Sequence, residues 1–218
     1  MQRKLEPELM DTPEEAVDYD RMDHSEVNRV FVDDLLAAWG AIESHVTVVD
    51  LGTGTAQIPM ELCGRNARIH VQAVDAAEHM LEVARRNVAA AVLEEQIELV
   101  LADAKLPAVG EYDIVMSNSL AHHLPEPAVM FDRLVELARP GGLIFVRDLL
   151  RPVDEAEWRH LVETYAGKEK PHARQMFADS LRAALTVDEV RAIVAAHSYD
   201  PQTVAATSDR HWTWCARK

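Results

Sequence analysis

Three acidic side chains lie at or near the ends of short apolar runs of the kind that form buried strands. They are Asp50 in VTVVDL (46–51), Asp75 in IHVQAVD (69–75) and Asp103 in IELVLAD (97–103). In open α/β sheets, ligands bind in the crevice at the carboxyl ends of parallel strands, so we expect these carboxylates to line one crevice. Carboxylates accept hydrogen bonds from ribose hydroxyls and from amino groups, and they attract cations. The pattern predicts a ligand with a ribose, an adenine and a positive charge.

A glycine-containing loop, Gly52-Thr53-Gly54, directly follows the first of these runs. The two glycines let the backbone turn sharply and let a ligand approach closely. Dinucleotide-binding proteins hold a pyrophosphate at the same place. Here Gln57 stands where their fingerprint has a third small residue, and the Asp50 carboxylate would repel a diphosphate. The same carboxylate suits a ligand that bears an ammonium and a sulfonium.

Two adjacent histidines, His122 and His123, follow the fourth strand-like run, YDIVMSN (112–118). The imidazole titrates near neutral pH, so either side chain could take a proton from a hydroxyl or an amine. The alternative is that this His-His-Leu segment only caps the loop before a helix expected at 127–138. We therefore regard both histidines as candidate catalytic residues with a structural alternative.

Asp148 lies in the fifth strand-like run, LIFVRDLL (143–150). Its carboxylate could orient an acceptor or bind a metal, and the alternative is a strand-end turn or a salt bridge. Cys63 and Cys215 are the only cysteines, and they form neither a disulfide framework nor a metal-binding spacing. Because histidines, cysteines and carboxylates show no zinc-type ligand cluster along the sequence, no metal site is predicted.

Tyr19 belongs to a segment, 17–43, in which apolar residues recur at helical spacing and predict a helix with Ser25 as a candidate N-cap. On such a helix Tyr19 shares a face with Asp23 and, less strictly, with Asn28. This face could contribute to a ligand site, and the alternative is that it is solvated.

Strands alternate with helices along residues 46–150, which predicts a parallel sheet covered by helices on both faces. The remaining expected strands and helices are 112–118, 143–150, 58–63, 78–93 and 127–138. The end of the chain, 200–218, predicts two strands joined by a turn near Ser208, and a hairpin there would be antiparallel. The fold class is therefore α/β, with a doubly wound, mostly parallel seven-stranded sheet that ends in an antiparallel hairpin strand.

The length of 218 residues fits one domain with additional helices. We expect a single domain over 1–218. Its parts are an N-terminal helical arm or lid (1–43, extended or loosely helical over 1–16), a cofactor-binding core (46–150), a helical insertion (152–185), and a C-terminal helix and hairpin (186–218). Thr186 and Glu189 form a capping box that starts the last helix.

The composition narrows the choice of partners. A net charge of −15 opposes binding to nucleic-acid phosphates and to anionic lipid surfaces, so we expect a small-molecule substrate, no nucleic acid and no membrane. The first residues form no apolar signal segment, and no run is long enough to span a membrane, so a cytoplasmic protein is expected. Homodimers are common among soluble enzymes, but no pattern here selects an oligomeric state.

Five segments in order make the chain resemble the class I, Rossmann-like S-adenosylmethionine-dependent methyltransferases. They are VVDLGTGTA, QAVDAAEHMLEVARRN, LVLADAKLP, YDIVMSNSLAHHL and LARPGGLIFVRD, and they cover about residues 46–150 densely. Each motif is short and weak by itself. Five motifs in this order, at expected strand ends, are together specific for the family. One departure is Ala56, where many members of the family have glycine, and a side chain this small should preserve binding.

The resemblance implies S-adenosyl-L-methionine as cofactor, S-adenosyl-L-homocysteine as product, and a set of cofactor-binding residues. Asp50, Gly52, Thr53 and Gly54 would surround the methionine part, Asp75 would hold the ribose, Ala76 and Met80 would flank the adenine, Asp103 and Ala104 would meet its amino group, and Asn118 and Ser119 would lie beside the cofactor. In this family an N-terminal helix often closes over the cofactor, which would bring Tyr19 to the methionine end.

The predicted function is methyl transfer to a small-molecule acceptor by in-line displacement. The sulfonium already activates the methyl group, so the protein mainly aligns the reactants and excludes water. A general base, for which His122, His123 and Asp148 are the candidates, is needed only when the acceptor atom carries a proton. The alternatives are a nicotinamide-dependent oxidoreductase on a related fold and a non-catalytic S-adenosylmethionine-binding protein.

Overall fold

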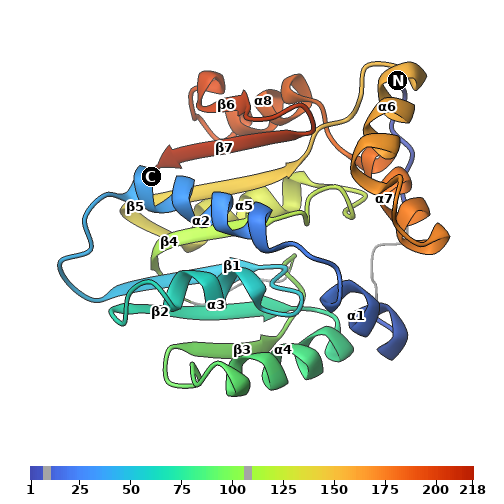
Figure 1. The fold of residues 1–218 in the computed structure, drawn as a ribbon. Coiled ribbons are helices and arrows are strands. Elements are labelled where there is room, and N and C mark those ends of the chain that lie inside the picture. The colour runs from blue at the N-terminus through green and yellow to red at the C-terminus, as the bar shows by residue number, and fades with distance from the viewer. Residues whose placement is uncertain (7–10, 106–109) are drawn as a thin grey trace. The chain divides into compact units, whose positions relative to one another are not determined.

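The computed structural model describes residues 1–6, 11–105 and 110–218 (Figure 1). The chain divides into two compact units. The larger unit contains Leu9–Asn118, Asp132–Val146 and Cys215–Lys218, and the smaller contains Met1–Glu8, Ser119–Phe131 and Arg147–Trp214. The single-domain division expected from the sequence stays a prediction, and part of the expected extended arm at 1–16 lies outside the described residues.

A seven-stranded sheet has the strand order β3-β2-β1-β4-β5-β7-β6. Its strands are β1 (Val46–Leu51), β2 (Ile69–Asp75), β3 (Ile97–Leu101), β4 (Tyr112–Asn118), β5 (Ala138–Leu149), β6 (Val204–Ala206) and β7 (His211–Arg217). β1 pairs in parallel with β2 and β4, and β2 pairs in parallel with β3. β6 and β7 pair antiparallel, with Val204 opposite Trp214. The predicted doubly wound, mostly parallel sheet with an antiparallel ending is confirmed.

Helices and strands of the larger unit enclose an apolar core. The helices are α1 (Pro13–Asp20), α2 (Ser25–Trp39), α3 (Gln57–Cys63) and α4 (Glu78–Ala90), and α5 (Ala128–Leu137) spans both units. Phe31 and Leu35 of α2 are buried with Val48 of β1, and the Phe31 ring meets Phe145 edge to face at 5.1 Å. Burial of side chains from helices and strands in one cluster explains why the strand sequences are almost continuously apolar.

The single helix predicted over 17–43 is wrong, because the chain forms two helices separated at 21–24. α1 begins earlier, at Pro13, where Thr12 and Glu15 make a capping box. Asp23 accepts hydrogen bonds from the backbone and the hydroxyl of Ser25. This local bonding competes with helical bonding and ends the first helix. Ser25 is therefore the first residue of α2 rather than its N-cap, and Tyr19 and Asp23 do not share a helix face.

β5 begins five residues earlier than the 143–150 run predicts, directly after α5. The backbone amides of Gly141 and Lys218 donate to the carbonyls of Lys218 and Gly142, respectively, and so carry the strand through the Arg-Pro-Gly-Gly segment. A Cβ atom at Gly142 would lie 2.9 Å from the Arg139 carbonyl oxygen and 3.0 Å from that of Tyr112. Glycine is required there by the close approach of neighbouring backbone.

The smaller unit contains α6 (Glu155–Ala166), α7 (Pro171–Ala183) and α8 (Val187–Ala196), with α6 and α7 beside each other (Figure 1). Leu161 and Leu181 are buried between these two helices. Trp212 and Trp214 are fully buried, with the Phe131 ring stacked on Trp214 at 5.3 Å. Both tryptophan side chains therefore contribute to the core of this unit.

Residues 1–6 are extended along the smaller unit. The Met1 amine donates to the Val153 carbonyl at 2.6 Å, and the Lys4 amide donates to the Arg182 carbonyl at 3.0 Å. Hydrogen bonds to backbone carbonyls thus fix the N-terminal segment at Met1 and at Lys4. Within the described part of the chain, no helix combines the length and the apolar character needed to cross a membrane.

Candidate functional site

The glycine loop after β1 is held by backbone hydrogen bonds to β2. The amides of Gly52 and Thr53 both donate to the Val74 carbonyl, at 2.9 and 3.0 Å. Gly52 and Gly54 have φ angles of +77° and +56°, a region that disfavours residues with a side chain. Ala56 also lies there, with φ +62°. The glycine that many family members carry at this position would avoid the steric cost of that φ.

Asp75, at the end of β2, binds the same loop. Its Oδ2 accepts from the Gly54 amide at 2.7 Å, and its Oδ1 accepts from the Ala77 amide at 2.9 Å. Burial raises the pKa of Asp75, although these backbone amides act in the opposite direction. A carboxylate has about four acceptor positions, so two backbone bonds leave capacity for the two hydroxyls of a ribose.

Asp50 is almost completely buried, with 3% of its surface exposed. Burial raises the pKa of its carboxyl group to about 7. The Thr53 side chain acts in the opposite direction, and the nearby Asp75 carboxylate acts in the same direction as burial. A buried anion is costly unless a positive charge accompanies it. This site therefore favours a ligand that brings a cation with it.

A hollow in the larger unit collects residues from the loop and from three helices. Its lining consists of Tyr19, Asn28, Asp50, Gly52, Thr53, Thr55, Gln57, Ile58 and Asn118. Five of these are residues that the sequence analysis assigned to the cofactor. Two further assigned residues, Gly54 and Asp75, adjoin this lining through the hydrogen bond between them.

Tyr19 reaches the glycine loop because α1 packs on α4. Ala16 is buried with Ala77, Met80 and Val83, and the Tyr19 side chain packs against this cluster. Its Cε1 lies 3.6 Å from the point that a Cβ atom of Gly54 would occupy. Burial raises the pKa of Tyr19 to about 12, with Asp75 and Asp50 acting in the same direction. The phenol is thus neutral and can donate a hydrogen bond at physiological pH.

Polar side chains that the sequence analysis did not assign connect the helices around the hollow. Asn28 donates to the Gln57 side chain at 3.1 Å, and Gln57 donates in turn to the Asp20 carboxylate at 3.2 Å. Asn87 of α4 donates to the same carboxylate at 2.8 Å. Two signals in the sequence pointed to these residues. Asn28 was expected to share a face with Tyr19, and Gln57 is a large polar residue where a dinucleotide fingerprint has a small one.

Four residues expected around the adenine lie outside the lining of this hollow. Met80 is buried in the cluster between α1 and α4, and Ala76 follows β2. β3 ends at Leu101, two residues before its predicted end, so Asp103 and Ala104 lie in the loop that follows. The backbone amide of Lys105 donates to Asp103 at 2.8 Å. The contacts of these four residues with a cofactor stay predictions.

Ser119 begins the smaller unit, with φ +57°, and its amide donates to the Arg147 carbonyl at 2.9 Å. The two units thus divide the pair Asn118-Ser119 that the sequence analysis assigned to the cofactor. Asn118 lines the hollow of the larger unit, and the role of Ser119 stays a prediction.

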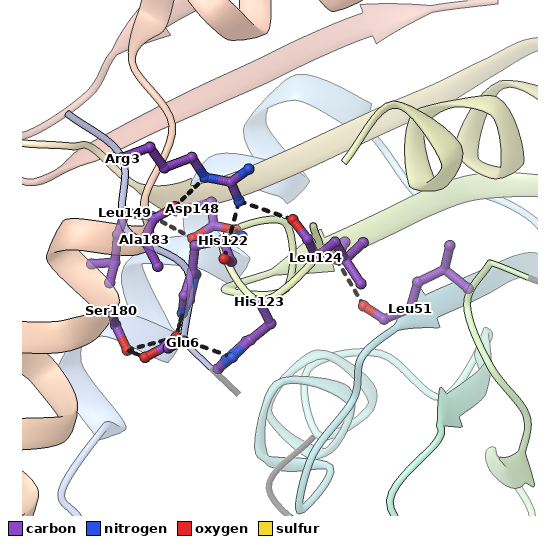
Figure 2. Close-up of polar contacts among 11 residues, drawn as sticks. Arg3, Glu6, Leu51, His122, His123, Leu124, Asp148, Leu149, Ser180 and Ala183 are labelled. Carbon is purple, nitrogen blue, oxygen red and sulfur yellow. Dashed lines mark hydrogen bonds and ion pairs between the residues drawn. The ribbon is translucent and has the colours of Figure 1, made fainter. Parts of the chain in front are cut away.

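In the smaller unit, His122 and Asp148 form a buried pair (Figure 2). His122 Nδ1 lies 2.5 Å from Asp148 Oδ1, and the His122 amide donates to Asp148 Oδ2 at 3.2 Å. Burial opposes both charges, but the mutual attraction outweighs it, so the pKa of His122 is raised and that of Asp148 is lowered. The salt bridge that was the alternative for Asp148 is present, and a catalytic role for either residue stays a prediction.

Glu6, from the N-terminal segment, joins this pair. Its Oε1 lies 3.4 Å from His122 Nε2 and 3.1 Å from His123 Nδ1. The Ser180 hydroxyl donates to the same carboxylate at 3.1 Å. No sequence signal pointed to Glu6, because it lies far from both histidines along the chain. A histidine between two carboxylates is held in its charged form, which makes His122 a poor general base without rearrangement.

Arg3 fixes the loop that carries the histidines. Its guanidinium donates to the carbonyl oxygens of His122 and Leu124, at 3.2 and 2.9 Å, and its Nε donates to that of Ala183 at 2.6 Å. The N-terminal segment therefore binds the loop in two ways, through the Glu6 carboxylate at the two histidines and through the Arg3 guanidinium at the backbone carbonyls.

Comparison with known proteins gives a match to a family described as a methyltransferase domain over residues 48–142. The ubiquinone biosynthesis O-methyltransferase of Paraburkholderia phytofirmans is 27% identical over 160 residues, which cover 71% of this chain and 67% of that protein. The trans-aconitate 2-methyltransferase of an Azoarcus species is 30% identical over 124 residues, covering 56% of this chain and 46% of that protein.

The solved structure of the plantazolicin methyltransferase BpumL with S-adenosylhomocysteine has the same fold. Its TM-score is 0.72 at 12% identity, and the superposition covers 93% of this chain and 88% of that one. The residues that match the methyltransferase-domain family include the glycine loop, the carboxylates of Asp50 and Asp75, and Asn118 of the hollow. These agreements support the cofactor that the charge and hydrogen-bonding pattern predicted and weigh against the nicotinamide alternative. Residues 48–142 thus match a methyltransferase-domain family, and the fold of the chain is that of solved S-adenosylmethionine-dependent methyltransferases.

Proposed function

We propose that this protein transfers a methyl group from S-adenosylmethionine to a small-molecule acceptor. The observation that carries the proposal is the buried Asp50 carboxylate beside the glycine loop, because a cationic cofactor would supply the positive charge that this group lacks. Both the loop and the carboxylate lie within the residues that match the methyltransferase family.

The residues of the larger unit fit this cofactor. Asp50 would attract the ammonium and the sulfonium, and Asp75 would accept from the ribose hydroxyls while it holds the Gly54 amide. Tyr19, neutral and packed beside the loop, would cover the methionine end and exclude water. The bound cofactor supplies a methyl group already activated for displacement, so the chain has mainly to bind, orient and desolvate the reactants.

The net charge of −15 supports a small acceptor over a nucleic acid. Two of the relatives support the same class, since one is a ubiquinone biosynthesis O-methyltransferase and another a trans-aconitate 2-methyltransferase. Their acceptors differ from each other, so we propose the class of acceptor and not one compound.

Calorimetric titration of the purified protein with S-adenosylmethionine and S-adenosylhomocysteine tests the cofactor, with NAD(H) as control. We expect micromolar binding of S-adenosylmethionine and S-adenosylhomocysteine, which corresponds to a binding free energy of about −8 kcal/mol. We expect no binding of NAD(H). Absence of binding, in protein freed of co-purified ligand, would contradict the proposal.

Catalysis is tested separately by measuring S-adenosylhomocysteine formation with a panel of phenolic, carboxylate, amine and quinone-like acceptors. We expect turnover with at least one acceptor. Tight cofactor binding without turnover on any compound of the panel would favour the alternative of a non-catalytic binding protein.

A further inference from the structure

One cluster of metal-ligating side chains lies in the smaller unit. Glu6, His122 and His123 each offer one ligand atom, and these atoms all lie within 4.8 Å of one another. All three residues belong to the same compact unit, and Figure 2 shows their side chains converging. Glu6 comes from the N-terminal segment, and the histidines come from the loop after β4.

Two of the three separations between the ligand atoms are those of a coordination shell, and the third is at most 4.8 Å. Metal–ligand bonds of about 2.0–2.1 Å at tetrahedral or octahedral angles place neighbouring ligand atoms about 2.9–3.4 Å apart. Glu6 Oε1 lies 3.1 Å from His123 Nδ1 and 3.4 Å from His122 Nε2. A metal ion would require only a small adjustment of these side chains.

Two outer contacts orient the ligands in the way that metal sites require. His122 uses Nδ1 for Asp148, at 2.5 Å, which leaves Nε2 directed at Glu6. The Ser180 hydroxyl holds the Glu6 carboxylate at 3.1 Å. A metal-bound histidine commonly donates its other ring N–H to a carboxylate, and metal-bound carboxylates are themselves hydrogen-bonded.

His123 provides an independent reason to expect a ligand. Its Nδ1 is buried yet makes no hydrogen bond to any described residue, although Glu6 lies 3.1 Å away. The rings of His122 and His123 lie 4.1 Å apart at an angle of 34°. Two imidazolium cations would repel at this distance. A divalent cation can displace the proton that the carboxylates hold on His122, and two neutral imidazoles can then share the ion.

We propose that Glu6, His122 and His123 form a binding site for a divalent transition metal, with Zn²⁺ as the representative ion. Two imidazole nitrogens and one carboxylate oxygen are a donor set of zinc and non-haem iron sites that keep open positions. An open position would take water or an oxygen-bearing ligand. The site stands on the contacts of the smaller unit alone and does not depend on the proposed function.

Metal binding has a structural consequence for the N-terminal segment. Glu6 is the last described residue of that segment, so the ion would link the segment to the histidine loop through coordinate bonds. Ligand binding that occurs only in the folded state stabilises that state by mass action. Zinc should therefore raise the unfolding midpoint of the protein.

The test is calorimetric titration of the chelator-treated, untagged full chain with Zn²⁺, followed by Co²⁺ for its visible absorption spectrum. We expect one equivalent to bind in the wild type and cobalt bands typical of nitrogen and oxygen ligands. Glu6→Gln and His123→Gln should each abolish this equivalent. Asp148→Asn and Ser180→Ala should weaken it by about 10–100-fold while the cobalt spectrum persists.

His79→Gln is the matched control, because His79 lies 3.0 Å from Asp11 but belongs to no cluster of three ligand side chains among the described residues. Its zinc binding should equal that of the wild type. S-adenosylhomocysteine binding and circular dichroism, measured on every variant, show separately whether the chain is folded. A wild type that binds no stoichiometric zinc would overturn the proposal, as would binding that persists unchanged in both Glu6→Gln and His123→Gln.

Discussion

The two compact units each bury an aspartate near the carboxyl end of a strand, and the two carboxyl groups shift in opposite directions. Asp50 of the larger unit is 3% exposed and its pKa is raised to about 7. Asp148 of the smaller unit is 1% exposed and its pKa is lowered. Burial opposes ionisation in both places, so burial alone does not decide the outcome.

The difference lies in what each carboxylate meets. Asp148 has His122 at 2.5 Å and the Leu149 amide at 2.6 Å, and these partners compensate for its desolvation. Asp50 has another carboxylate, Asp75, near it. In the smaller unit, groups of the protein compensate the buried charge of Asp148. In the larger unit, a cationic ligand would compensate the charge of Asp50. A buried carboxylate without a compensating cation thus marks a ligand site more clearly than a buried ion pair does.

The largest expected effect is on stability, from Asp148→Ala. The substitution leaves His122 buried beside Glu6 with its main partner removed, and breaking a buried ion pair costs about 3–5 kcal/mol. Urea unfolding at pH 7 measures the free energy of unfolding. Asp188→Ala, at an exposed position of the same unit, is the control and should leave the midpoint unchanged. Equal midpoints for the two variants would show that the Asp148–His122 pair does not stabilise the smaller unit, contrary to the difference that we infer between Asp148 and Asp50.

Asp50→Asn should affect the cofactor-free protein in the opposite direction. The folded pKa of about 7 exceeds the unfolded value near 3.8, so this carboxyl favours folding fully below pH 3.8 and that contribution is lost as pH rises to 7. The loss amounts to at most about 4 kcal/mol. Asn removes it, so the unfolding free energy of the variant should fall less between pH 4 and pH 7 than that of the wild type.

The same variant should bind S-adenosylmethionine more weakly, which separates a binding role from a structural one. If the folded Asp50→Asn variant binds the cofactor as tightly as the wild type does, the assignment of Asp50 to the cationic ligand is contradicted.

Asp75→Ala should weaken S-adenosylmethionine binding by about 10–150-fold. It removes hydrogen bonds to a charged acceptor, which contribute about 1.5–3 kcal/mol, and it releases the Gly54 and Ala77 amides. Calorimetry measures the affinity, and Asp33→Ala, which removes a surface salt bridge of the same unit, serves as control. Unchanged binding in Asp75→Ala would refute the site assignment.

The smallest expected effect is that of Ala56→Gly. Glycine removes the steric cost of the left-handed φ of +62°, which is about 1–2 kcal/mol. It also raises the conformational entropy of the unfolded chain and removes a buried methyl group, and both changes destabilise the folded protein. These contributions nearly cancel, so we expect a change within about 1 kcal/mol in the free energy of unfolding. Denaturant unfolding checks this, and a loss of several kcal/mol would show that the methyl packing dominates.

Much of the larger unit could be predicted from the sequence, because its signals are local. The apolar runs at 46–51 and 69–75 match β1 and β2, and the glycines after β1 have the positive φ angles that their residue type suggests. The position of Asp75 beside the loop also follows from the strand order. The separation of α1 from α2 was missed because the apolar spacing continues across it, while the Asp23–Ser25 bonding that ends the helix has a weaker signature.

The cluster in the smaller unit could not be predicted as a whole. His122, His123 and Asp148 were each candidates, since a histidine pair and a strand-end carboxylate are visible in the sequence. Glu6 and Ser180 were not, because an N-terminal glutamate and a helical serine are common residues with no distinguishing pattern. Glu6 reaches the histidines, and Ser180 reaches Glu6, because residues 1–6 run along the smaller unit.

The sequence by itself determined the alternating strands and helices, the glycine loop, the carboxylates at strand ends and the family to which they point. These features follow from periodicity and residue type over short stretches of chain, where the physical causes are local. Only the tertiary structure decided that Asp148 meets a histidine whereas Asp50 lies near another carboxylate, and that Glu6 faces two histidines. Whether a buried charge finds a partner depends on residues distant in sequence, and no local pattern records them.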